Sequence, residues 1–217
     1  ILDNGKAQKV WLSINAIPVL SERGGVRLVL LTMTDISEQR NLRNEVRQLS
    51  AKDPLTGVFS QEHVIRLLEN EIHRARRYGT PFALAQLDVD SFSALCAEHG
   101  RKLGDQALSE IGQLLIKCMR EIDILGRIGD SEFLLVLPGR DLASTQALAE
   151  QLNQLARQQL NITLSLGLTG FEPHDTARVM LRRADLALYR AKSQGRSQAC
   201  IADPLPETED LASSPMR

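Results

Sequence analysis

The chain has few cysteines and no excess of charge of either sign. Its three cysteines, Cys96, Cys118 and Cys200, are odd in number and lack paired metal-type spacing, so the sequence supports neither a disulfide framework nor a zinc site. The 26 basic and 27 acidic side chains nearly cancel, which argues against a nucleic-acid binder that works by bulk electrostatic attraction. A small anionic ligand held by a few placed groups stays open.

Long apolar runs are also absent. No stretch approaches the ~18 apolar residues that span a bilayer, and the N-terminus lacks a basic region, an apolar region and a cleavage site in series. We therefore expect a cytoplasmic location and no membrane contact within this segment. The first residue is Ile1 rather than Met, so an anchor could lie upstream. The length of 217 residues suffices for one full domain and a smaller piece.

The N-terminal region predicts two strands and a helix. Residues 10–16 and 26–34 are rich in β-branched and apolar residues, and a turn cluster separates them. An isolated hairpin is marginal in water, so we expect these strands to pair with upstream sequence or with another chain. Asp35 as N-cap and Glu38 as its capping-box partner then predict a helix that runs through Leu49.

This helix carries a short heptad-like stripe. Leu42, Val46 and Leu49 are spaced four and then three residues apart, which suits the seam of a parallel dimer. An amphipathic helix that packs on its own domain is the alternative.

The remainder alternates helices and strands, which indicates an α/β sheet covered by helices. Gly129 and Asp130 lie between Arg127 and an apolar run, and they predict a β-hairpin at the edge of that sheet. The sequence after Ile201 is polar and Pro-rich and reads as a linker or tail. Helices are predicted at 61–78, 103–119, 142–158 and 176–193, with strands at 82–87, 134–138 and 162–169.

An acidic pair follows the predicted strand at 82–87. Asp88 and Asp90 are two residues apart, so both project from one face if the strand continues. These carboxylates and the Val89 carbonyl are hard oxygen ligands of the kind that suits Mg²⁺ bridging phosphates. Surface turns also carry such pairs.

Two sets of motifs resemble known families. Two strands followed by Asp35-Ile36-Ser37-Glu38 resemble the C-terminal end of a PAS sensor domain, whose ligand-holding part is absent here. The second set resembles the GGDEF domain of diguanylate cyclases over about residues 53–200. It comprises Asp53-Pro-Leu-Thr-Gly57, Leu87-Asp-Val-Asp-Ser-Phe92, Gly104-Asp105, Arg127 to Phe133, Ser165-Leu-Gly167 and Ala184 to Arg196.

The second resemblance implies a fold and a reaction. The fold is α/β (α+β), nucleotidyl-cyclase-like, with a central, mostly antiparallel sheet covered by helices. The family joins two GTP molecules, one per protomer of a dimer, into cyclic di-GMP. We expect a partial PAS domain at 1–37, a signalling linker helix at 38–52, a GGDEF domain at 53–202 and a polar tail at 203–217.

The resemblance also assigns site residues. Asp88 and the Val89 carbonyl match the Mg²⁺ ligands, and Asp105 matches a guanine contact. Gly129, Lys192 and Arg196 match nucleotide-binding positions, the last two as phosphate contacts; a solvated helix end is the alternative for them. Magnesium is implied only if nucleotide binding is retained.

Several positions depart from the family pattern. The signature reads Gly-Asp-Ser-Glu-Phe instead of Gly-Gly-Asp/Glu-Glu-Phe, so Ser131 cannot supply the catalytic carboxylate. Adjacent strand residues face opposite sides, and Asp130 or Glu132 would therefore need a one-residue register slip to replace it. Ser93 and Cys96 stand where the family has a phosphate-binding lysine and a guanine-binding asparagine.

One further constellation matches the family. Arg120 and Asp123 begin nine residues before Gly129 and resemble the inhibitory Arg-x-x-Asp site for cyclic di-GMP. An arginine fork can grip a phosphate or a guanine edge, and an aspartate can accept from guanine N–H groups. A surface ion pair is the alternative. Arg140 or Arg157 could complete the site.

Three hypotheses follow. The first is a catalytically inactive regulator that senses cyclic di-GMP at Arg120 and Asp123 or passes a PAS signal through the helix; the second is a low-activity cyclase; the third is a dimerisation or docking module. The expected ligand is cyclic di-GMP or GTP. The Gly-Asp-Ser start resembles composite PAS, GGDEF and EAL regulators such as FimX. The heptad-like stripe favours a homodimer through the linker helix, and the polar tail would suit a following EAL domain.

Overall fold

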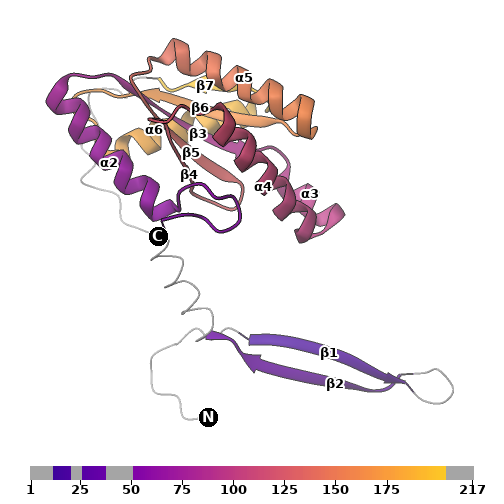
Figure 1. Ribbon diagram of the computed structural model, residues 1–217. Coiled ribbons are helices and arrows are strands. Elements are labelled where there is room, and N and C mark those ends of the chain that lie inside the picture. The colour runs from indigo at the N-terminus through magenta and orange to yellow at the C-terminus, as the bar shows by residue number, and fades with distance from the viewer. Residues whose placement is uncertain (1–11, 21–25, 38–50, 204–217) are drawn as a thin grey trace. The chain divides into compact units, whose positions relative to one another are not determined.

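The computed structural model describes residues 12–20, 26–37 and 51–203. The chain divides into two units, residues 1–50 and residues 51–217, which are described separately. In the first, β1 (Leu12–Leu20) pairs antiparallel with β2 (Val26–Asp35) (Figure 1). Both predicted strands are confirmed, although β1 extends four residues beyond the predicted end.

Apolar side chains line one face of the first hairpin, and Ile17 and Leu30 lie opposite each other on the other face. Directly opposed residues of an antiparallel pair share a face, and Ile14 lies opposite Met33 while Ala16 lies opposite Leu31. Ile14, Leu31 and Met33 are all more than half exposed. The predicted linker helix lies almost wholly outside the described residues. Its start is visible, because the Ser37 N–H donates to Asp35 Oδ1 at 2.8 Å as an N-cap requires.

The second unit contains a five-stranded sheet with the strand order β4-β5-β3-β6-β7. The central strand β3 (Phe82–Val89) pairs antiparallel with both β5 (Glu132–Pro138) and β6 (Leu164–Gly170). The edge strand β4 (Ile124–Arg127) is antiparallel to β5, and β7 (Ala199–Ile201) is parallel to β6. The mostly antiparallel sheet and the edge hairpin are therefore confirmed.

Five helices accompany this sheet: α2 (Gln61–Tyr78), α3 (Phe92–His99), α4 (Arg101–Cys118), α5 (Leu142–Leu160) and α6 (Ala177–Ser193). The four predicted helices are confirmed to within two residues at each end. The short elements α3 and β7 were not predicted, since neither offers enough turns or alternations for a clear period. Among the described residues, no helix is long and apolar enough to cross a membrane.

Each face of the sheet has its own apolar core, because successive strand residues point to opposite faces. Leu87 and Phe133 pack with α4 and α5 residues such as Ile111. Leu84 and Leu134 pack instead with residues of α2 and α6. Figure 1 shows α2 and α6 on one side of the sheet and α5 and α4 on the other. This alternation aims the even-numbered residues of β3 and β5 toward α2 and α6.

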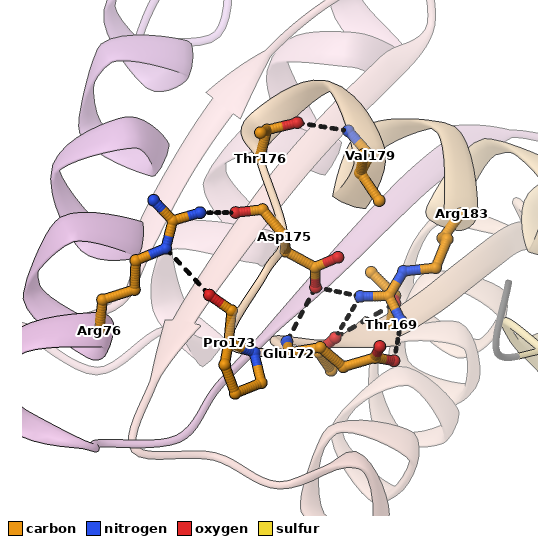
Figure 2. A network of polar contacts seen from close by, with 9 residues as sticks. Arg76, Thr169, Glu172, Pro173, Asp175, Thr176, Val179 and Arg183 are labelled. Carbon is orange, nitrogen blue, oxygen red and sulfur yellow. Dashed lines mark hydrogen bonds and ion pairs between the residues drawn. The ribbon is translucent and has the colours of Figure 1, made fainter. Parts of the chain in front are cut away.

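A buried arginine fixes the connection from β6 to α6 (Figure 2). The Arg183 side chain on α6 is only 4% exposed, and it pairs with the carboxylates of Asp175 and Glu172. It also donates to the Gly170 carbonyl at 2.8 Å. Burial raises the pKa of Asp175, although the charge of Arg183 opposes this. The connection is thereby tied to the helix that follows it.

The same connection is tied to α2. Arg76 donates from Nε to the Pro173 carbonyl at 3.1 Å and from its other end to the Asp175 carbonyl. The Thr176 hydroxyl accepts from the Val179 N–H at 3.3 Å and caps α6. Figure 2 shows these contacts converging on the loop from the two helices.

We predict that Arg183→Met strongly destabilises the domain. The change leaves the buried Asp175 carboxylate without its cation, at a cost of about 3–5 kcal/mol in the free energy of unfolding. The matched control is Arg178→Met on the same helix, where the side chain is exposed and the expected effect is within about 0.5 kcal/mol. Urea denaturation followed by circular dichroism measures both; equal effects would contradict the prediction.

Candidate functional site

The β4–β5 hairpin ends in the loop 128–131. The Ile128 N–H donates to the Glu132 carbonyl at 2.9 Å and closes this loop. Gly129 lies against the Glu132 side chain, and an added Cβ would approach Glu132 Oε2 to 2.9 Å. The absence of a side chain at Gly129 therefore gives the Glu132 carboxylate its place.

Arg127 holds the tip of the hairpin. Its Nε donates to the Gly129 carbonyl at 3.1 Å, and a terminal nitrogen donates to the Asp130 carbonyl at 2.9 Å. Its other nitrogen lies 3.3 Å from Asp53 Oδ1. The same carboxylate accepts from the Thr56 N–H and hydroxyl at 2.9 and 2.6 Å. Burial opposes ionisation of Asp53, but the bonds from Thr56 and the charge of Arg127 lower its pKa overall.

Two carboxylates face each other beside this tip. Asp88 at the end of β3 lies directly opposite Glu132, the first residue of β5, so the two share a face. The expectation that Glu132 would need a one-residue register slip to aim at the position beside Asp88 is wrong. It assumed that Ser131 and Glu132 both belong to the strand, whereas Ser131 lies in the loop before β5 begins.

Lys192 and Ser131 contact this acidic pair. Lys192 Nζ lies 2.7 Å from Asp88 Oδ2 and 4.0 Å from Glu132 Oε1. The Ser131 hydroxyl donates to Asp88 Oδ1 at 2.5 Å. Burial raises the pKa of Glu132; the charge of Asp88 adds to this and that of Lys192 opposes it.

The donor set at this point does not suit Mg²⁺. Mg²⁺ needs free oxygen ligands in octahedral geometry, but Lys192 and Ser131 engage both carboxylate oxygens of Asp88. The Val89 N–H donates to the Ser131 carbonyl at 3.1 Å. Within the described residues, no group of three or more His, Cys, Asp or Glu side chains could hold a metal ion.

Asp90 has a different environment from Asp88. β3 ends at Val89, and the Asp90 carboxylate accepts from the hydroxyls of Thr163 and Ser165 at 2.7 and 2.6 Å. It also accepts from the Ser197 N–H at 3.0 Å. This last bond anchors a turn in which Arg196 and Ser197 both have positive φ, 63° and 52°. Asp90 thus holds the turn that presents the exposed Arg196.

The predicted guanine-contacting residue lies on α4. Asp105 pairs with Arg101 at 3.1 Å, one helical turn earlier. No hydrogen bond or ion pair joins it to the hairpin within the part of the chain that the structure describes. Cys96 on α3 packs against Gly104, where an added Cβ would lie 2.4 Å from the cysteine sulfur. Ser93 is exposed.

Arg120 and Asp123 form a second polar cluster. The Arg120 N–H donates to Asp123 Oδ2 at 2.9 Å, and an Arg140 nitrogen lies 3.4 Å from the same oxygen. Of the two arginines that could complete the site, Arg140 reaches the cluster, whereas Arg157 donates to Ser197. The Asp123 side chain is 0% exposed, whereas Arg120 is exposed and its guanidinium has no partner among the described residues.

The Arg120–Asp123 cluster contains unsatisfied polar atoms. Asp123 Oδ1 and Arg140 Nε are buried and have no hydrogen-bond partner among the described residues. Such atoms are rare, because an unpaired buried polar group is costly. They mark a place where a ligand could supply the missing partners.

Sequence reasoning missed the contacts that bind the hairpin together. The Arg127–Asp53 pair joins residues 74 positions apart, and the Ser131 hydroxyl reaches across to β3. The only available signal was that each residue stands within a recognised motif. Neither contact follows from periodicity or spacing, because both depend on how the strands and the 53–57 turn pack.

The family described as "Diguanylate cyclase, GGDEF domain" matches residues 50–198. The diguanylate cyclase DgcP of Pseudomonas aeruginosa is 35% identical over 164 residues, which cover 72% of this chain and 24% of DgcP. The chain spans about a quarter to a half of the length of the curated relatives it matches.

Two solved structures share the fold. The FimX GGDEF domain from Pseudomonas aeruginosa is 27% identical with a TM-score of 0.65, and the match covers 70% of this chain and 98% of that one. A microbial GGDEF domain studied for its interaction with cyclic di-GMP is 25% identical with a TM-score of 0.66. That match covers 72% of this chain and 99% of the other.

We predict that Asp53→Asn destabilises the domain in a pH-dependent way. The lowered pKa of Asp53 means that its ionised form stabilises the fold above the unfolded pKa of about 4. This stabilisation is lost as the pH falls through the folded pKa. We expect a loss of about 1–3 kcal/mol at pH 7, which shrinks as the solution is acidified below about pH 4.

Urea denaturation over a pH series measures this difference. Asp130→Asn is the matched control, because that aspartate is exposed in the same region and its side chain has no partner among the described residues. A pH-independent loss for Asp53→Asn would show that its effect does not arise from ionisation.

Proposed function

Because the chain belongs to the GGDEF-domain family of diguanylate cyclases, we propose that its domain acts in cyclic di-GMP signalling as a catalytically inactive regulator. This proposal rests on the contacts of the Asp88 carboxylate. A lysine and a serine hydroxyl engage it, and no third carboxylate stands at position 131.

The expected loss of catalysis follows from charge. Joining two GTP molecules develops negative charge that preorganised groups must stabilise, and removal of one such group typically costs about 10²–10³ in kcat. Ser131 stands in place of a carboxylate, and Ser93 and Cys96 stand in place of two side chains that the family uses to bind phosphate and guanine. Each of these losses costs about 1–3 kcal/mol of ligand interaction.

The Arg120–Asp123 cluster supports cyclic di-GMP binding. The exposed Arg120 offers a free guanidinium for a phosphate or a guanine edge. Asp123 Oδ1 is an acceptor without a donor, and a guanine N–H would satisfy it after a rotation that exposes the carboxylate. The likeness to a GGDEF domain studied with cyclic di-GMP adds support.

A low-activity cyclase is the second candidate. Asp88, Glu132 and Lys192 still converge beside the hairpin, and DgcP, at 35% identity, is named a diguanylate cyclase. In this alternative Asp88 and Glu132 would hold Mg²⁺, which would neutralise phosphate charge, and Lys192 would contact a nucleotide phosphate.

We propose the same domain layout that the sequence indicates. It comprises a partial PAS domain at 1–37, a linker helix at 38–52 that pairs two protomers, a GGDEF domain at 53–202 and a tail at 203–217. The division of the chain after Ser50 and the family match over residues 50–198 support the central boundary. A FimX-like arrangement with a downstream EAL domain belongs to this proposal.

We predict micromolar binding of cyclic di-GMP that depends on Arg120 and Asp123. Arg120→Ala removes the exposed guanidinium, and Asp123→Asn removes the negative charge with little change of shape. Isothermal titration calorimetry should show at least about tenfold weaker binding for each, which is 1.4 kcal/mol. Arg157→Ala is the matched control, because this arginine contacts Ser197 instead. Unchanged affinity in both variants would rule out this cluster as the binding site.

We also predict that the chain forms no cyclic di-GMP from GTP and Mg²⁺. The physical reason is the missing carboxylate at Ser131, and chromatography of the nucleotide products measures it. DgcP assayed in parallel serves as the control. Product formation by the wild-type chain that Glu132→Gln abolishes would instead establish the low-activity cyclase.

A further inference from the structure

The acid pair of the hairpin needs a counter-charge. Asp88 and Glu132 lie directly opposite each other on neighbouring strands, and like charges in this position repel. Asp88 is largely buried, with a side-chain exposure of 14%, so solvent screens the repulsion only in part. A cation beside both carboxylates therefore stabilises the ionised pair.

Lys192 supplies this charge from within the chain. Its Nζ lies 2.7 Å from Asp88 and 4.0 Å from Glu132. The lysine stands in the last turn of α6, where the helix dipole also favours a cation. One ammonium thus serves both carboxylates.

Ser131 satisfies the second carboxylate oxygen of Asp88. Its hydroxyl donates to Asp88 Oδ1 and occupies the carboxylate oxygen that Lys192 leaves free. A carboxylate at position 131 would act only as an acceptor when ionised and would add a third negative charge. A single ammonium would then be insufficient, and a divalent cation would be favoured.

We propose that Lys192 is a built-in counter-ion that replaces a divalent cation at the Asp88–Glu132 pair, so that the wild-type hairpin binds no Mg²⁺ or Mn²⁺. The inference rests on the proposed inactive regulator. It adds that Ser131 and Lys192 together exclude the metal.

The test uses Mn²⁺ and the full chain. Wild type, Lys192→Met, Ser131→Asp and the double variant are titrated with Mn²⁺, with binding followed by electron paramagnetic resonance and thermal unfolding. We expect no binding and no change of Tm for the wild type. Both single variants should gain a site, and the double variant should bind at least about tenfold more tightly than either. Mn²⁺ should raise the Tm of Lys192→Met, because a ligand of the native state stabilises it by mass action.

Controls keep the outcomes separate. Lys117→Met removes an exposed lysine of α4 and should gain no site. Ser131→Asp retains Lys192 and tests the inference if Lys192→Met fails to fold. Wild-type Mn²⁺ binding that Asp88→Asn abolishes would overturn the inference, as would variants that gain nothing. Failure of the proposed function gives a different result: the wild type would then bind neither cyclic di-GMP nor Mn²⁺.

Discussion

The antiparallel register between β3 and β5 determines which side chains meet at the hairpin. It places Asp88 opposite Glu132 and aims both toward the α2 and α6 side of the sheet, where Lys192 lies in the last turn of α6. A shift of one residue would send Glu132 to the α4 and α5 side, because the side-chain period of a strand is two. The polar site therefore depends on the apolar pattern of the same strands.

Buried charge elsewhere in the domain is compensated in a similar way. Arg127 pairs with Asp53 while it binds the carbonyls of the hairpin loop, and Arg183 pairs with Asp175 beneath the connection to α6. Arg127 joins segments 74 residues apart, whereas Arg183 ties the β6–α6 connection to the helix that follows it. Asp123 Oδ1 and Arg183 Nε are both buried without a hydrogen-bond partner among the described residues. The Arg120–Asp123 cluster differs from the Arg183–Asp175 pair in the exposed Arg120 beside it.

Much of the fold could be predicted from the sequence. The helices at 61–78 and 142–160 and the strands around 82–89 and 132–138 follow from apolar periodicity and turn residues. α3 and β7 could not, because eight and three residues are too short for a clear period. The site was predicted only in part. The motifs identified Asp88 and Lys192, but not their contact with each other or with Ser131.

The sequence by itself determined the longer helices and strands, the family and the chemical departures at Ser93, Cys96 and Ser131. These are local properties, since each depends on residue type and on neighbours a few positions away. Only the tertiary structure decided that Glu132 faces Asp88, that Asp90 anchors the Arg196 turn and that Asp123 is buried beside Arg140. Strand register and helix docking create these contacts between distant residues, and no spacing in the chain encodes them.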